Sequence, residues 1–198
     1  MRFFKSLTLV GTLFTLFGCV SNQQQLQAGM SELNDHWGSV DSKIYAKDGS
    51  RYYRADNKTC MNAAMKAALE LGFEVTSSEN NLLILRSSYP KPFTAQEAQQ
   101  IVDVEEPIAQ AIVANKVGST NSNSFHMGKG ENNYILLKIT TSSEKDGITK
   151  VSAIFSGEPK NLPPGGSVAG KYSPPEVVRI GLKKWWDSYE KNFKLKKS

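Results

Sequence analysis

Four carboxylates lie close together between residues 97 and 106, where two of them could cooperate in hydrolysis. They are Glu97, Asp103, Glu105 and Glu106. A glycosidase needs such a pair, with one carboxyl as proton donor and the other as nucleophile or base. Glu97, however, also completes a capping box with Thr94 at a helix start, and the other three precede Pro107 on what we expect to be a solvated surface. We therefore predict no catalytic residue in this cluster.

Other residue types that carry catalysis or bind metals are sparse. The two histidines, His36 and His126, are far apart in the chain, and His126 with Met127 would need a further soft ligand to hold a metal such as Cu(I). Residues 128–130 lack the third glycine and the following helix of a nucleotide-binding loop. The sequence contains no G-x-S-x-G, H-E-x-x-H or P-loop motif. We predict a non-enzymatic protein without a metal or cofactor.

The last part of the chain combines aromatic and basic side chains. Six lysines and two carboxylates lie in the final sixteen residues. A helical pattern directs Trp185 to the core, whereas Trp186, about 100° further around the helix, should be partly exposed. Trp186, Lys183 and Lys184 therefore form a candidate interaction surface for anionic lipid headgroups or an acidic protein. Some of these lysines could instead complement the helix dipole.

The N-terminus has the pattern of an export signal. Arg2 and Lys5 precede an uncharged, mostly apolar segment at residues 7–18. This segment is short for a membrane about 30 Å thick but has the length of a signal-peptide core. It ends in Leu16-Phe17-Gly18-Cys19, which resembles the lipobox of bacterial lipoproteins. The resemblance implies cleavage after Gly18 and acylation of the Cys19 thiol. An ordinary secretory signal and an uncleaved anchor are the alternatives.

The same resemblance suggests a location. In Gram-negative lipoproteins the residue after the lipidated cysteine influences sorting, and Val20, rather than Asp, implies the periplasmic face of the outer membrane in a Gram-negative host. An exported location disfavours a nucleic-acid partner. Lipidation of Cys19 would leave Cys60 as the only free thiol, without an intramolecular disulfide partner. We expect Cys60 to be buried, with a reactive or intermolecular thiol as the alternative.

Composition places the remainder of the chain among ordinary globular proteins. The 198 residues are 39% hydrophobic and 22% charged, which excludes whole-chain disorder, collagen and coiled coil. We expect a signal peptide at 1–18, a lipidated cysteine and polar tether at 19–43, and a single periplasmic domain at 44–198. Leu33 and Trp37 interrupt the polar tether and allow a short helix near 31–42.

Regular structure begins with a short strand at 51–54. Apolar residues at three- and four-residue steps predict a helix at 59–71, which Gly72 ends. Strands at 73–76 and 82–86 follow. The capping box at Thr94 opens a helix that extends to about residue 116 and that Pro107 should break, kink or restart.

A second pair of strands and a last helix complete the pattern. The strands lie at 134–141 and 148–156, joined at Asp146-Gly147. Ser173, Pro174 and Pro175 then open a helix with one apolar face. This face consists of Val178, Leu182, Trp185, Tyr189 and Phe193. The expected fold is a two-layer α+β sandwich: an antiparallel sheet of two hairpins and the short first strand, with helices on one face.

This order of elements over about residues 50–193 resembles, in pattern alone, the small α+β modules of outer-membrane accessory lipoproteins, including those of the β-barrel assembly machinery. A shared fold does not transmit a function. We expect an envelope lipoprotein whose non-catalytic domain binds a protein partner or supports envelope assembly. A cell-wall hydrolase using paired carboxylates and a small-ligand or lipid carrier are the alternatives.

Overall fold

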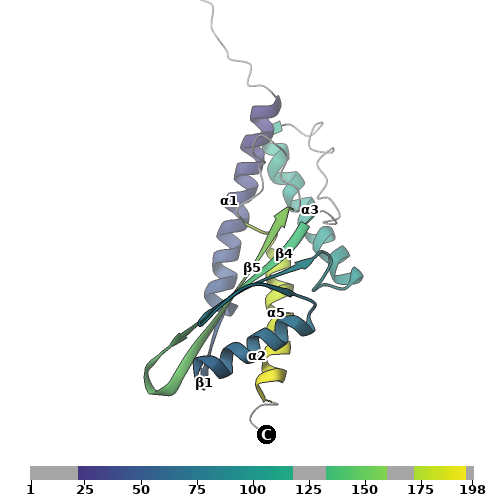
Figure 1. The fold of residues 1–198 in the computed structure, drawn as a ribbon. Helices are drawn as coiled ribbons and strands as arrows, with labels where there is room; N and C mark the ends of the chain where they lie inside the picture. The colour runs from purple at the N-terminus through teal and green to yellow at the C-terminus, as the bar shows by residue number, and fades with distance from the viewer. Residues whose placement is uncertain (1–21, 118–132, 160–171, 195–198) are drawn as a thin grey trace, which may run out of the picture.

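The computed structural model of the protein describes residues 22–117, 133–159 and 172–194. Its helices are α1 (Asn22–Asp48), α2 (Asn57–Glu70), α3 (Ala95–Val117) and α5 (Pro175–Lys194), and its strands are β1 (Ser50–Arg54), β2 (Glu74–Glu79), β3 (Leu82–Ser88), β4 (Asn133–Ser143) and β5 (Ile148–Pro159). The strands form one antiparallel sheet in the order β1-β5-β4-β3-β2 (Figure 1). The predicted α+β class and both predicted hairpins are confirmed.

The core lies between one face of the sheet and helices α2 and α5. Alternate residues of β3, β4 and β5 are buried there: Leu83, Leu85, Leu137, Ile139, Val151, Ala153 and Phe155. Gly181 of α5 lies directly on the Phe155 ring, because a Cβ at position 181 would come within 2.6 Å of Phe155 Cδ1. The absence of a side chain at Gly181 therefore sets how closely α5 can approach the sheet.

Helix α2 is rich in alanine, which also allows close packing. Asp56 caps its start by accepting a hydrogen bond from the Thr59 N–H at 2.6 Å. The predicted stop after this helix is confirmed, since Gly72 has a φ of +82°. Cys60 is fully buried on the inner side of α2, as expected for a structural thiol.

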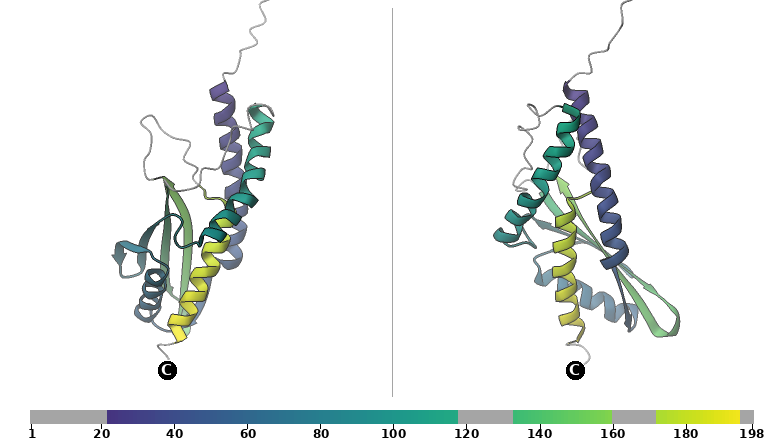
Figure 2. Two further views of the ribbon diagram at one scale, coloured as in Figure 1. Left: turned by 90° about the vertical axis from the view of Figure 1, so that its right-hand side faces the viewer. Right: turned by 180° about the vertical axis from the view of Figure 1, so that it is seen from behind.

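The segment expected to be a polar tether is helical from Asn22 onwards. Helix α1 contains 27 residues and is therefore about 40 Å long. Leu33 and Trp37 pack against Ala109 and Val113 of α3 in a small second core. Both views of Figure 2 show the N-terminal part of α1 beside the C-terminal part of α3, beyond the end of the sheet. We call this pair the α1–α3 arm.

Two side chains close the part of β5 that β1 leaves unpaired. Strand β1 pairs only with residues 148–152 of β5. Further along this edge, the Tyr45 hydroxyl donates to the Phe155 carbonyl at 2.6 Å and accepts from the Phe155 N–H at 3.1 Å. The Gly157 N–H donates to Ser173 Oγ at 2.6 Å. These bonds attach α1 and the start of α5 to an edge that would otherwise be open to strand pairing.

Helix α3 continues through Pro107 as a single element, so the proline neither ends nor restarts it. One expectation about helices is corrected. Trp186, expected to be partly exposed, is only 1% exposed. Its Nε1–H donates to the Asp48 carbonyl at 2.7 Å, and the Arg51 guanidinium lies 4.6 Å from its ring centre. Helix α5 is covered both by the sheet and by the end of α1, so two tryptophans on different sides of the helix are both buried.

We predict that Trp186→Ala lowers the free energy of unfolding by about 3–5 kcal/mol, as much as Trp185→Ala, because both leave a large cavity. Lys183→Ala is the matched control on the exposed side of the same helix and should change stability by less than about 0.5 kcal/mol. Urea denaturation of the three variants measures this. A Trp186→Ala variant as stable as Lys183→Ala would contradict the burial of this ring.

Candidate functional site

The structure does not bring the three residues of the predicted C-terminal surface onto one exposed patch. Trp186 is buried. Lys184 Nζ forms an ion pair with Glu97 Oε2 at 2.6 Å and links α5 to the start of α3. Lys183 is exposed and pairs with Asp187 of its own helix at 2.9 Å. Two of the three side chains therefore serve internal packing.

Each of the four clustered carboxylates accepts a hydrogen bond from a neighbouring group. The capping box is confirmed, since Glu97 Oε2 accepts from the Thr94 N–H at 2.7 Å and Thr94 Oγ1 accepts from the Glu97 N–H at 3.2 Å. Asp103 accepts from Gln99 at 2.8 Å, and Glu106 accepts from Gln110 at 3.3 Å. The expectation that Glu105 is solvated is wrong, because it is only 2% exposed.

Glu105 is buried because it caps another helix. Its Oε1 accepts from the Glu176 N–H at 2.8 Å, at the start of α5. From α1, Asp41 hydrogen-bonds the backbone of Ser173, and Asn34 Oδ1 accepts from the Tyr172 N–H at 3.1 Å. The first N–H groups of a helix have no partner within it and favour negative charge. Glu105 of α3 therefore supplies an acceptor to the first turn of α5, and α1 binds the segment just before that helix.

Burial changes the protonation of these two carboxyls. It raises the pKa of Asp41 to about 7, against the opposing hydrogen bond from the Ser173 backbone, and the charge of Glu105 acts in the same direction as burial. Burial also raises the pKa of Glu105, although the backbone of Glu176 favours its charged form. The pair is enclosed by α1, α3 and the start of α5, so we assign it a structural role.

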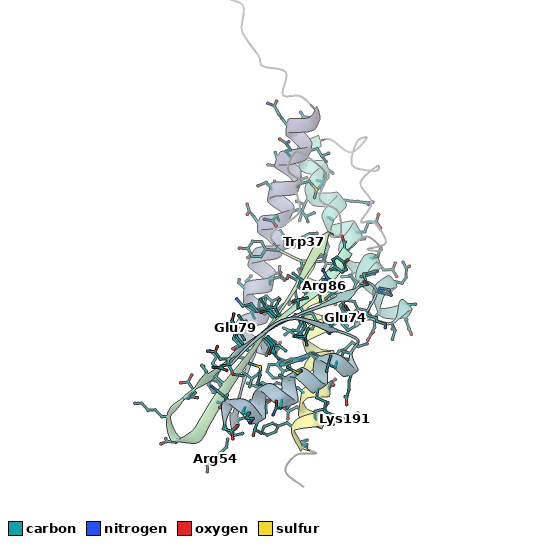
Figure 3. The ribbon with its side chains drawn as sticks, in the orientation of Figure 1. Trp37, Arg54, Glu74, Glu79, Arg86 and Lys191 are labelled. Atoms are coloured by element: carbon teal, nitrogen blue, oxygen red, sulfur yellow. The ribbon has the colours of Figure 1, made fainter. Side chains whose placement is uncertain are left out.

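The sheet face opposite the core carries exposed apolar and basic side chains together. Residues directly opposite one another in an antiparallel pair lie on the same face. Tyr52, which is 63% exposed, stands opposite Lys150, and Ile154, which is 47% exposed, stands opposite Lys138. Arg54 ends β1 on this side, near the lower end of Figure 3. We call Tyr52, Arg54, Lys138, Lys150 and Ile154 the outer sheet face.

No described carboxylate lies within ion-pair distance of the three cations of the outer sheet face. Glu74 and Glu79 also lie on this side of the sheet, on β2 at the far edge. The part of the face formed by β1, β5 and β4 is therefore basic over residues 50–54, 134–142 and 148–156. Sequence analysis did not single these residues out.

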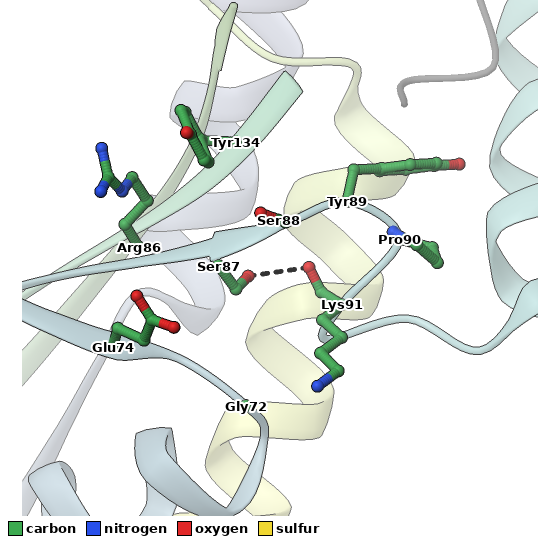
Figure 4. Close-up of a pocket in the computed structure, with 9 residues that line it drawn as sticks. All are labelled: Gly72, Glu74, Arg86, Ser87, Ser88, Tyr89, Pro90, Lys91 and Tyr134. Atoms are coloured by element: carbon green, nitrogen blue, oxygen red, sulfur yellow. Dashed lines mark hydrogen bonds between the residues drawn. The ribbon is translucent and has the colours of Figure 1, made fainter. Parts of the chain in front are cut away.

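Two concavities adjoin these elements. One, of about 410 Å³, lies at the ends of β2 and β3, and we call it the strand-end hollow; Glu74, Arg86, Ser88, Tyr89, Lys91 and Tyr134 line it (Figure 4). The other, of about 390 Å³, has Ile44, Ile180, Leu182 and Trp186 as its apolar residues, and we call it the helix groove. The cations of the helix groove are neutralised: Arg51 pairs with Glu190, Arg179 with Glu176 and Lys183 with Asp187.

Several sequence-based expectations fall outside the described residues: Cys19, His126 and the segment 118–130. His36 lies exposed on α1. Within residues 22–117, 133–159 and 172–194, no three His, Cys, Asp or Glu side chains group as metal ligands. None of the helices in those ranges is long and apolar enough to cross a membrane.

No protein-family model, curated protein or solved structure matches this chain.

We predict that Asp41→Asn changes how stability depends on pH. A carboxyl whose pKa is raised from 3.8 to about 7 binds more protons in the folded state. The stability it contributes is complete below the unfolded pKa and is lost as the pH rises through about 7. The Asn side chain does not ionise, so the variant should gain stability relative to the native chain as the pH rises from about 4 to about 7, with little further change above that.

Urea denaturation across this pH range measures the difference between the two proteins. Asp103→Asn is the matched control, because Asp103 is exposed on α3, and its difference from the native chain should stay constant. Parallel pH profiles for Asp41→Asn and the native chain would show that Asp41 ionises normally.

Proposed function

We propose that this protein is a lipid-anchored envelope protein, attached through Cys19, whose non-catalytic α+β domain binds a protein partner through the outer sheet face. The observation that carries this proposal is the exposure of Tyr52 and Ile154 beside three cations without described ion-pair partners. Exposed apolar side chains of a folded domain mark interaction surfaces when they are grouped. The surrounding cations favour a partner with an acidic surface.

The position of the anchor supports a protein rather than a membrane as the partner. Only Val20 and Ser21 separate Cys19 from the start of α1. Figure 1 shows the start of α1 and the C-terminal end of α5 at opposite ends of the molecule. An upright domain would therefore place the α1–α3 arm next to the membrane and the basic end of α5 away from it. Val20 favours the periplasmic face of the outer membrane in a Gram-negative host.

The two alternatives have less support. A hydrolase would need two carboxylates facing each other in a cleft, whereas Glu97 and Glu105 cap helices and Asp41 is enclosed. A lipid carrier could use the helix groove, whose volume suits a small ligand. However, each of its three cations already holds a carboxylate, so a charged headgroup would have to displace an internal ion pair.

The anchor is tested by Cys19→Ala. We predict that this variant remains an unprocessed precursor and incorporates no palmitate, because the thiol is the acyl acceptor. Cys60→Ala is the matched control and should be labelled like the native chain, since Cys60 is buried in α2. Palmitate labelling of the Cys19→Ala variant would contradict the lipoprotein assignment.

The partner surface is tested by photo-crosslinking in the native envelope. A photoreactive residue at position 154 should give a discrete adduct, and one at the exposed position 103 of α3 should not. Lys138→Glu with Lys150→Glu should abolish the adduct from position 154, and raised salt should weaken it, because both reduce the attraction of an acidic partner. An adduct that forms equally from both positions, or that survives the charge reversal, would refute this surface.

A further inference from the structure

The strand-end hollow combines charged groups that the rest of the fold does not use. Glu74 of β2 stands directly opposite Arg86 of β3, and Lys91 lies on the turn after β3. The described residues form no ion pair with any of these three. By contrast, four cations of α5 hold carboxylates: Arg179, Lys183, Lys184 and Lys191. The hollow therefore keeps both signs of charge available to a ligand.

An aromatic ring positions the central cation. The Arg86 guanidinium lies 4.3 Å from the centre of the Tyr134 ring, on the neighbouring strand β4. Figure 4 shows Arg86 and Tyr134 together on one side of the hollow, Glu74 below them, and Tyr89 and Lys91 on the other side. An arginine held by a ring instead of a carboxylate retains its fork of N–H donors for an incoming anion.

Hydrogen bonds to backbone carbonyls fix the turn that carries Lys91. Ser87 Oγ donates to the Lys91 carbonyl at 2.8 Å, and the Lys91 N–H donates to the Ser88 carbonyl at 3.1 Å. The Tyr89 N–H donates to the Asn133 carbonyl at 3.2 Å. Gly72 makes room for the lysine, since a Cβ there would lie 2.9 Å from Lys91 Cδ. The walls are thus held in place before a ligand arrives, which lowers the cost of binding.

The chemistry of the walls selects the ligand class. The lining is mostly polar, so an acyl chain would find little apolar surface. A bare inorganic anion would use Arg86 and Lys91 but would face the Glu74 carboxylate and fill little of the 410 Å³. A sugar ring can pack on the half-buried Tyr89, donate hydroxyl hydrogen bonds to Glu74 and exchange others with Ser88. A carboxylate on that ring would be held by Arg86 and Lys91.

We propose that the strand-end hollow binds an acidic saccharide, a sugar ring bearing a carboxylate, with Arg86 and Lys91 on the carboxylate and Glu74 on the hydroxyl groups. This site requires neither the lipid anchor nor a partner on the outer sheet face. The residues of the outer sheet face do not line it.

The test uses the full chain, purified in detergent, and two probes that differ mainly by one acidic group. N-acetylmuramic acid carries a carboxylate that N-acetylglucosamine lacks. Calorimetric titration should show binding of N-acetylmuramic acid. The affinity for N-acetylglucosamine should be lower by about tenfold or more, as the loss of a charge-assisted hydrogen bond implies. Arg86→Gln should weaken binding of the acidic sugar by about tenfold, whereas Lys183→Gln, at an exposed cation elsewhere, should leave it unchanged.

Three outcomes would overturn the proposal: equal binding of the two sugars, binding of inorganic phosphate as tight as that of the acidic sugar, and no binding of either sugar. Circular dichroism confirms that Arg86→Gln is folded. If it is not, Glu74→Gln and Lys91→Gln give the same comparison, and a failure of both to weaken binding would equally exclude the hollow. Failure here leaves the envelope and partner proposals standing, because those are tested at positions 19, 138, 150 and 154.

Discussion

The start of α5 is the junction on which the arrangement of the whole domain depends. Helix α5 buries Trp185, Trp186 and Tyr189 in the core, and Pro175, Val177 and Val178 of its first turn are buried as well. The N–H groups of that turn need acceptors, and a buried N–H without one would be costly. Glu105 of α3 supplies one of these acceptors, to the Glu176 N–H, and Asn34 of α1 accepts from the Tyr172 N–H just before the helix. The requirement of one helix terminus therefore joins the α1–α3 arm to the sheet.

This junction also leaves one face of the sheet open. Helices α2 and α5 occupy the core face, and α1 is held along the edge of β5 by Tyr45 and by the segment around Ser173. Because these helices cover only the core face and the β5 edge of the sheet, the strand residues of the opposite face are exposed to solvent. Both surfaces for which we propose partners, the outer sheet face and the strand-end hollow, lie on that side. The internal packing and the available binding surface are thus two results of one arrangement.

Elements with local signals could be predicted from the sequence. The β4–β5 hairpin was recognisable because Asp146 and Gly147 favour the positive φ values of 61° and 69° that they adopt. Helix α1 was missed as a long helix although its apolar residues do follow three- and four-residue steps. These residues are Met30, Leu33, Trp37, Val40 and Ile44. Glutamine, asparagine and serine residues interrupt this pattern. The apolar face of α1 becomes evident only when its packing against α3 is known. Trp186 was misplaced because periodicity identifies one apolar stripe, whereas α5 has neighbours on two sides.

The residues that we assign to sites could not be found by pattern, for a different reason. Glu105 has a charged neighbour and precedes Pro107, as a surface residue would, and it is buried only because Glu176, far along the chain, needs an acceptor there. Glu74, Arg86 and Tyr134 lie on three strands and meet through the register of the sheet. A strand pattern identifies the side that faces the core and treats the other side simply as polar. The chemistry proposed for this chain depends on which polar residues become cross-strand neighbours, and strand pairing alone decides that.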